Sequence, residues 1–120
     1  MIRHIVFFTA IDNDNIESIR KGLQMLTGIP HAQHLEISLN RKSDPNSKEI
    51  DVVVYGEFAD DAALAAYKAH DTYAEAIRRV KPLRELRFAV DYDQAQAFTT
   101  PDGQACNSLS RGRAKHSAAR

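Results

Sequence analysis

With 120 residues, the chain has the length of a single domain that can bury a core of its own. Its 43% hydrophobic and 27% charged residues are ordinary for a soluble globular protein. The formal charge is zero, but residues 1–93 hold 12 Lys and Arg against 15 Asp and Glu, and a faintly acidic body argues against nucleic-acid binding.

The first half of this body predicts a strand, a helix and a second strand. Ile2–Thr9 is rich in β-branched and aromatic residues, which favours a strand. Apolar residues recur at helical spacing over Ile16–Leu26, with Asp12 before them as a capping side chain and Gly28 after them as a terminator. Leu35–Leu39 then alternates apolar and polar side chains, as a strand with one polar face does.

The second half predicts a strand, two helical pieces and a last strand. Ile50–Phe58 is a predicted strand whose middle is apolar on both faces. Asp60 and Asp61 begin a helix that runs to Tyr67. Thr72 and Glu75 have the spacing of a capping box, which predicts the start of a second helical piece. A proline ends that piece, and Leu83–Tyr92 forms the last strand.

This order of elements predicts an α+β fold, the ferredoxin-like β-α-β-β-α-β plait, with a four-stranded antiparallel sheet and helices on one face. The first and third predicted strands carry apolar side chains on both faces. A lone plait would therefore expose a larger apolar patch than soluble monomers usually tolerate. We expect a homodimer in which two sheets pack face to face as a closed or nearly closed dimeric α/β barrel.

The remaining residues, 94–120, form a separate polar and weakly basic C-terminal tail. They hold four Lys and Arg against one Asp, and too few apolar side chains to offset their own ordering entropy. Cys106 is the only cysteine and has no intramolecular partner, and no stretch approaches the roughly 20 apolar residues of a membrane span. We expect a cytoplasmic protein without a signal peptide or membrane segment.

Several short motifs follow one another in a specific order. They are Arg3–Phe7, Ile29-Pro30, Glu57-Phe58, Tyr67-x-x-His70, Val80-x-Pro82 and Val90–Tyr92. In this order the chain resembles the stress-responsive A/B barrel (Dabb) domain family over residues 1–93. The resemblance implies a dimeric α+β barrel. It leaves the activity open, because the family spans plant stress-related proteins, a polyketide cyclase and many bacterial members of unknown role.

In the cyclase-type members, a Tyr and a following His near the helix junction act as an acid/base pair on a polyketide chain. Tyr67 stands at the matching Tyr position, and His4 and His70 also match. The later His of the family's His-Pro-x-His pattern is replaced by Tyr73, and a His of the third strand by Val52. The resemblance thus implies an acid/base site from which two histidines are missing.

The candidate catalytic residues are therefore Tyr67, His70 and His4. His4 shares a strand face with core residues, so it is either a general base or a buried, hydrogen-bonded structural histidine. Tyr67 and His70 lie three residues apart and would share a face of a continuing helix, where the imidazole could polarise the hydroxyl. Alternatively, His70 caps the end of its helix.

We expect His4, Tyr67, His70 and Tyr73 to line one pocket between helices and sheet. The candidate ligand contacts are Tyr73, Val52, Phe8 and Leu64. No metal or cofactor is predicted, because the sequence has no phosphate-binding glycine loop and its one pair of nearby histidines has no third ligand at a suitable spacing.

Two classes of function follow. The first is a homodimeric small-ligand-binding or stress-related protein, whose partners are a second copy and a small hydrophobic or aromatic ligand. The alternative is a cofactor-free enzyme, polyketide cyclase-like or monooxygenase-like, that uses Tyr67, His70 and His4 as acid/base groups. The two missing histidines favour the first class.

Overall fold

The computed structural model describes residues 1–101 and contains one antiparallel sheet of four strands. The strands are β1 (Ile2–Ala10), β2 (His34–Leu39), β3 (Val52–Phe58) and β4 (Arg84–Asp93), in the spatial order β2-β3-β1-β4. The helices are α1 (Ile16–Gln24), α2 (Asp61–Ala69) and α3 (Asp71–Val80), with 3₁₀ turns at Asn13–Asn15, Met25–Gly28 and Gln94–Gln96. The predicted ferredoxin-like fold is confirmed, although β3 begins two residues after the predicted Ile50.

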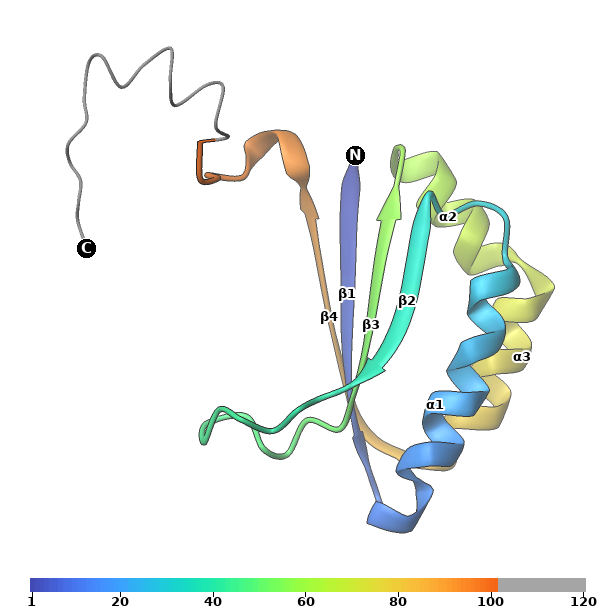
Figure 1. The fold of residues 1–120 in the computed structure, drawn as a ribbon. Helices are drawn as coiled ribbons and strands as arrows, with labels where there is room; N and C mark the ends of the chain where they lie inside the picture. Colours follow the sequence, from blue (N-terminus) through green and yellow to red (C-terminus); the bar gives the residue numbers. More distant parts are fainter. Residues whose placement is uncertain (102–120) are drawn as a thin grey trace, which may run out of the picture.

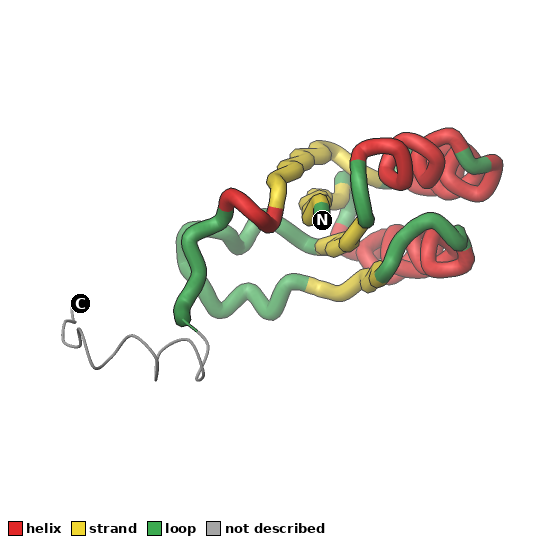
Figure 2. The backbone as a smooth tube through the Cα atoms, turned by 90° about the horizontal axis from the view of Figure 1, so that it is seen from above, coloured by secondary structure: helices red, strands yellow, loops and turns green. Residues whose placement is uncertain are grey.

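The helices all cover the same side of the sheet (Figure 1), which the view from above also shows (Figure 2). The core lies between the two layers, and its largest fully buried side chains are Tyr67, Phe58, Ile19, His4, Val52, Val54 and Val80. No helix within residues 1–101 is both long and apolar enough to cross a bilayer.

The junction between α2 and α3 differs from the prediction. His70 has an extended backbone, with φ −70° and ψ 144°, so it ends α2 and precedes α3. Its Nδ1 accepts a hydrogen bond from the Thr72 N–H at 3.1 Å, which makes His70 the N-cap. The predicted capping box at Thr72 and Glu75 is therefore wrong: Thr72 lies inside α3, and Glu75 instead pairs with two arginines of its own helix.

A β-bulge interrupts the pairing of β1 with β4. Phe8 pairs with Arg87 and Ala10 pairs with Arg84, so β4 uses one more residue than β1 between these positions. The Thr9 hydroxyl accepts the Leu86 N–H at 2.9 Å, which satisfies a backbone donor of the bulged strand. Residues three apart on a regular strand point to opposite faces, but the bulge turns Arg84 and Arg87 to the same, helix-covered face.

We call the sheet face away from the helices the bare face. By the strand register its apolar side chains are Ile5, Phe7, Val53, Tyr55, Leu86, Phe88, Val90 and Tyr92. Those of β4 are the most exposed: half of the surface of Phe88 and half of that of Val90 remain accessible. The loop between β2 and β3 and the segment after β4 project beyond this face at its two ends (Figure 1). The predicted two-sided apolar sheet is thus present.

The predicted tail over 94–120 lies mostly outside the described residues, as does Cys106. Within the described part, β4 runs to Asp93, whose carboxylate accepts the Ala95 N–H at 2.9 Å and caps the 3₁₀ turn Gln94–Gln96. The last strand of the sheet therefore ends at Asp93.

Gly56, which pairs with His4 across the sheet, offers a test of the packing beneath the helices. A methyl group at this position would lie 2.7 Å from Leu35 Cδ1 and 2.9 Å from Phe58 Cε1. We expect Gly56→Ala to lower the free energy of unfolding by about 1–3 kcal/mol because the core must shift to accept it. Urea denaturation at one fixed protein concentration measures the change. Gly28→Ala is the matched control, since its methyl group meets nothing within 4 Å; equal effects of both variants would contradict the expected overpacking.

Candidate functional site

A cavity of about 370 Å³ lies between the sheet and the helix layer. Its lining residues come from all three helices, three of the four strands and the turns that follow α1 and α3. They are His4, Val6, Phe8, Leu23, Leu26, Val54, Tyr67, Lys68, Tyr73, Ala76, Ile77, Val80, Lys81, Arg84 and Arg87. The floor is buried and mostly apolar, and the cationic side chains lie at more exposed positions.

His4 is the most deeply buried histidine of the described residues, with 1% of its surface exposed. Its Nδ1 is hydrogen-bonded to Oδ1 of Asp91, its cross-strand partner on β4. A carboxylate only accepts hydrogen bonds, so the pairing assigns the proton to Nδ1 and leaves the lone pair on Nε2. His4 therefore has the arrangement of a general base that is oriented by a carboxylate.

Burial is the main influence on the charge of His4. It lowers the pKa of the imidazole below its ordinary value of 6.5, and the neighbouring charges of Lys68 and Arg87 act in the same direction. The hydrogen bond to Asp91 opposes this lowering of the pKa but does not overcome it. The folded chain therefore takes up this proton less readily than the unfolded one, so His4 favours folding above pH 6.5 and loses that contribution as the pH falls below it.

Tyr67 projects from the last turn of α2 into the core, where 1% of its surface is exposed. Its ring packs 4.9 Å from that of Phe58 and 5.2 Å from that of Tyr73, and lies 6.3 Å from that of His4, measured between ring centroids. Its hydroxyl has no hydrogen-bond partner within residues 1–101, and the residue lines the cavity. Burial raises the pKa of Tyr67 far above its ordinary value, with Arg87 opposing. The hydroxyl therefore stays protonated and can donate to a bound molecule.

The cavity brings together three of the four residues predicted to line it: His4, Tyr67 and Tyr73. Its lining does not include His70, so that part of the prediction is wrong. The helix breaks at His70. The His70 ring accepts a hydrogen bond from the Thr72 N–H, and its centroid lies 6.0 Å from that of the His31 ring. An Nδ1 that accepts a hydrogen bond carries no proton, so a neutral imidazole suffices for this capping role.

Among the predicted ligand contacts, Phe8 and Tyr73 line the cavity. Val52 and Leu64 do not. Val52 is completely buried and Leu64 nearly so, because both belong to the hydrophobic core rather than to the cavity wall. The structure therefore leaves both side chains out of the lining of this cavity.

Sequence reasoning missed the partner of His4 and the cations of the cavity. A signal for Asp91 was available in principle, because antiparallel pairing of the first and last strands of the plait brings positions near 4 and 91 together. Arg84 and Arg87 had no such signal, because the bulge that aligns them is not visible in the sequence. Within residues 1–101, no three His, Cys, Asp or Glu side chains lie close enough to hold a metal ion.

Comparison with known proteins identifies the family. The family model for the stress responsive A/B barrel domain matches residues 2–94. The chain belongs to this family. Among curated protein sequences, none matches it.

Solved structures of other proteins share the fold. A Dabb family protein with a ferredoxin-like fold from Mesorhizobium loti is 26% identical; the alignment covers 77% of this chain and 94% of that one, with a TM-score of 0.63. A dimeric ferredoxin-like protein of unknown function from Jannaschia sp. CCS1 is 21% identical, with 77% and 97% coverage and a TM-score of 0.69. A putative antibiotic biosynthesis monooxygenase from Nitrosomonas europaea is 21% identical, with 78% and 97% coverage and a TM-score of 0.65. The last two show the fold alone.

Replacing the partner of His4 tests the electrostatics of this Dabb domain. We expect Asp91→Asn to lower the pKa of His4 further, because the carboxylate is what opposes the effect of burial. An NMR titration of the His4 ring proton measures the pKa in both proteins. Asp93→Asn, two residues along the same strand, is the control and leaves the His4 pKa unchanged. A pKa of His4 that does not fall in Asp91→Asn would contradict the pair in solution.

Proposed function

We propose that the protein is a homodimer that binds a small, largely apolar organic molecule in the cavity of each protomer. The observation that carries the proposal is the Tyr67 hydroxyl: its residue is 1% exposed and lines the cavity, and no hydrogen bond joins the hydroxyl to the described residues. Because the hydroxyl is accessible from the cavity and donates to no protein acceptor, it is available to donate to a ligand atom placed there.

The cavity has the size and composition of a ligand site. Its volume of about 370 Å³ falls within the range typical of such pockets, about 300–1,000 Å³. Apolar side chains make up most of the wall, and Tyr67, His4 and Tyr73 supply a few polar atoms near its buried part. Such a site favours a compact aromatic or aliphatic body that carries at least one hydrogen-bond acceptor.

The bare face supports the homodimer. Its exposed apolar side chains lie on adjacent strands, and a two-fold axis would bury two such patches against each other, as in the predicted barrel. Arg3, which by register also lies on the bare face, has a buried Nε with no partner within residues 1–101, and a partner subunit would supply an acceptor. The relatives described as dimeric have the same fold. A cytoplasmic setting is part of this proposal.

The paired His4 and Asp91 favour a second function, cofactor-free proton transfer. His4 Nε2 would take a proton from the carbon next to a ketone, and the electron pair of the broken C–H bond would move onto the ketone oxygen as an enolate. Tyr67 would donate its hydrogen bond to that oxygen. His4 then delivers a proton to the carbon, either the same one or one exchanged with water, so that the ketone and the neutral imidazole are restored. No role for His70 enters this scheme.

Tyr67→Phe tests the ligand site with a neutral probe, 2-acetylnaphthalene. We expect the variant to bind this ketone several-fold to about tenfold more weakly in an NMR titration, because the phenolic donor is lost. Tyr55→Phe, on the bare face, is the control for loss of a hydroxyl outside the cavity and keeps the original affinity. Binding by the original protein that leaves the cavity resonances unmoved would contradict the ligand site.

The same ketone in heavy water tests proton transfer. Exchange of its methyl protons for deuterium, accelerated by the original protein and lost in His4→Gln, would support the enzyme. Binding without exchange would leave the protein as a ligand-binding dimer and reject acid/base catalysis on this class of ketone.

Val90→Glu tests the homodimer. Two-fold symmetry would place two added carboxylates in the buried interface, so we expect light scattering after size exclusion to show a monomer instead of a dimer. Ala65→Glu, on an exposed part of α2, adds the same charge away from the bare face and should leave the dimer intact. A Val90→Glu protein that remains a dimer would place the interface elsewhere.

A further inference from the structure

The lining of the cavity has a one-sided charge. Among its fifteen residues are four cations, Lys68, Lys81, Arg84 and Arg87, and no Asp or Glu. This bias runs against the composition of the domain, because residues 1–93 hold more acidic than basic side chains. A random sample of this surface would contain carboxylates as often as cations.

The four cations also lack internal partners. Within residues 1–101, none of them forms an ion pair, whereas Arg20, Arg78, Arg79 and Lys42 all pair with carboxylates. Like charges that surround one opening repel each other, and this repulsion costs free energy unless an anion lies among them. The clustering of these four cations therefore favours the binding of a negatively charged group among them.

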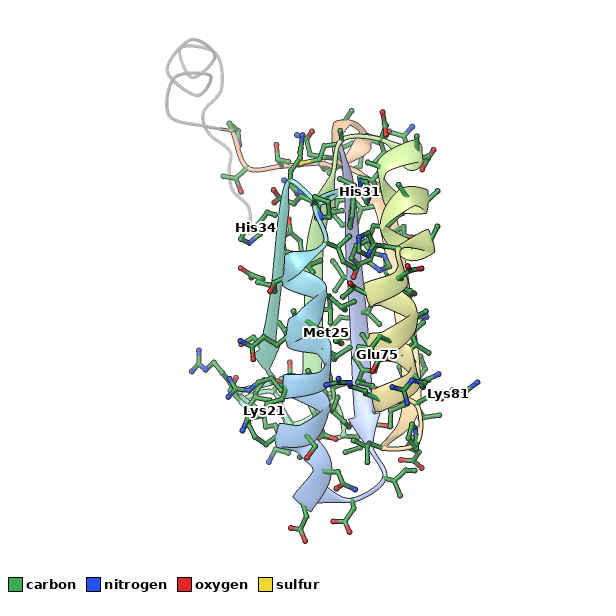
Figure 3. The ribbon with its side chains drawn as sticks, turned by 90° about the vertical axis from the view of Figure 1, so that its right-hand side faces the viewer. Lys21, Met25, His31, His34, Glu75 and Lys81 are labelled. Atoms are coloured by element: carbon green, nitrogen blue, oxygen red, sulfur yellow. The ribbon has the colours of Figure 1, made fainter. Side chains whose placement is uncertain are left out.

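Three separate elements contribute these cations to the lining of one cavity. Lys68 belongs to the last turn of α2, and Lys81 directly follows α3, at the lower end of that helix in Figure 3. Arg84 and Arg87 share the helix-covered face of β4 only because of the bulge. Their origin in a helix, a turn and a strand distinguishes this set from a charged face of one helix.

The cations and the polar groups line the same cavity, so one ligand can contact both. Arg87 lines this cavity together with His4 and Tyr67, and its positive charge acts to lower the pKa of both groups. Beyond them the wall is apolar, with Leu23, Leu26 and Val80. A molecule with an apolar body inside and an acidic group at the mouth would satisfy both parts of the site at once.

We propose that the ligand of this cavity is a small organic anion, whose carboxylate or phosphate is held by Arg87, Lys68, Arg84 and Lys81 while its apolar body occupies the cavity. The proposal rests on the proposed ligand-binding function and adds the chemical class of the ligand. Arg87 is the principal anchor, because a guanidinium offers two parallel donors to an oxyanion. Lys68 contributes a further positive charge from α2.

Matched eight-carbon probes test the charge preference on the full-length protein. Octanoate, octyl phosphate and octanamide share one apolar body and differ in the head group, so calorimetry or NMR titration isolates the contribution of the anion. We expect at least one of the two anions to bind about tenfold more tightly than the amide, with affinity that falls as salt is raised. The tighter of the two anions identifies the oxyanion.

Charge-removing variants locate the anion. We expect Arg87→Gln to lose about tenfold in anion affinity and to bind octanamide as before. Lys68→Gln, at an exposed helix position that tolerates substitution, is the second variant and should lose several-fold. Arg41→Gln is the matched control, because Arg41 is exposed and does not line the cavity; it should bind all three probes unchanged.

The outcomes distinguish the proposed anion binding from the ligand-binding function on which it rests. Equal binding of anions and amide in the cavity would overturn the anion and leave the ligand site in place. Anion binding that Arg41→Gln weakens as much as Arg87→Gln would also overturn it, since the effect would then be general charge attraction. Failure of all three probes to bind at millimolar concentration would overturn both proposals.

Discussion

The antiparallel pairing of β1 with β4 is the constraint on which the site depends. It sets Asp91 opposite His4, so that the most buried imidazole of the described chain has a carboxylate at one ring nitrogen. A few residues further along, the same pairing contains the bulge that turns Arg84 and Arg87 to the helix-covered face. One strand pair thus positions both His4 and half of the cations in the lining of the cavity.

The break between α2 and α3 has an equally large effect. Because the backbone becomes extended at His70, Tyr67 ends one helix and Tyr73 begins the next, and their rings meet at 5.2 Å over the cavity floor. An uninterrupted helix would have placed Tyr67 and His70 on one face. Instead, His70 closes the N-terminus of α3 with its own ring nitrogen. A residue that looks catalytic by its neighbours in sequence thus has a local structural role.

The two faces of the sheet differ in what they carry. The helix-covered face carries the His4–Asp91 pair and the cavity, and the bare face carries exposed aromatic and branched side chains that a second copy would cover. The division follows from the period of two along each strand, which sends His4 and Ile5 to opposite sides. Assembly on one face and ligand binding on the other need not compete for the same residues.

The sequence by itself determined the order of elements, the antiparallel plait, the two-sided apolar strands and the family, because these depend on local periodicity and on motifs that need no knowledge of distant contacts. It also placed His4, Tyr67 and Tyr73 near one another. Only the tertiary structure decided that His70 caps a helix, that Val52 and Leu64 belong to the core, and that Asp91, Arg84 and Arg87 join the site. The reason is physical: strand register, a one-residue bulge and a helix break are settled by packing across the sheet, and each changes which way a side chain points without leaving a mark in the local pattern.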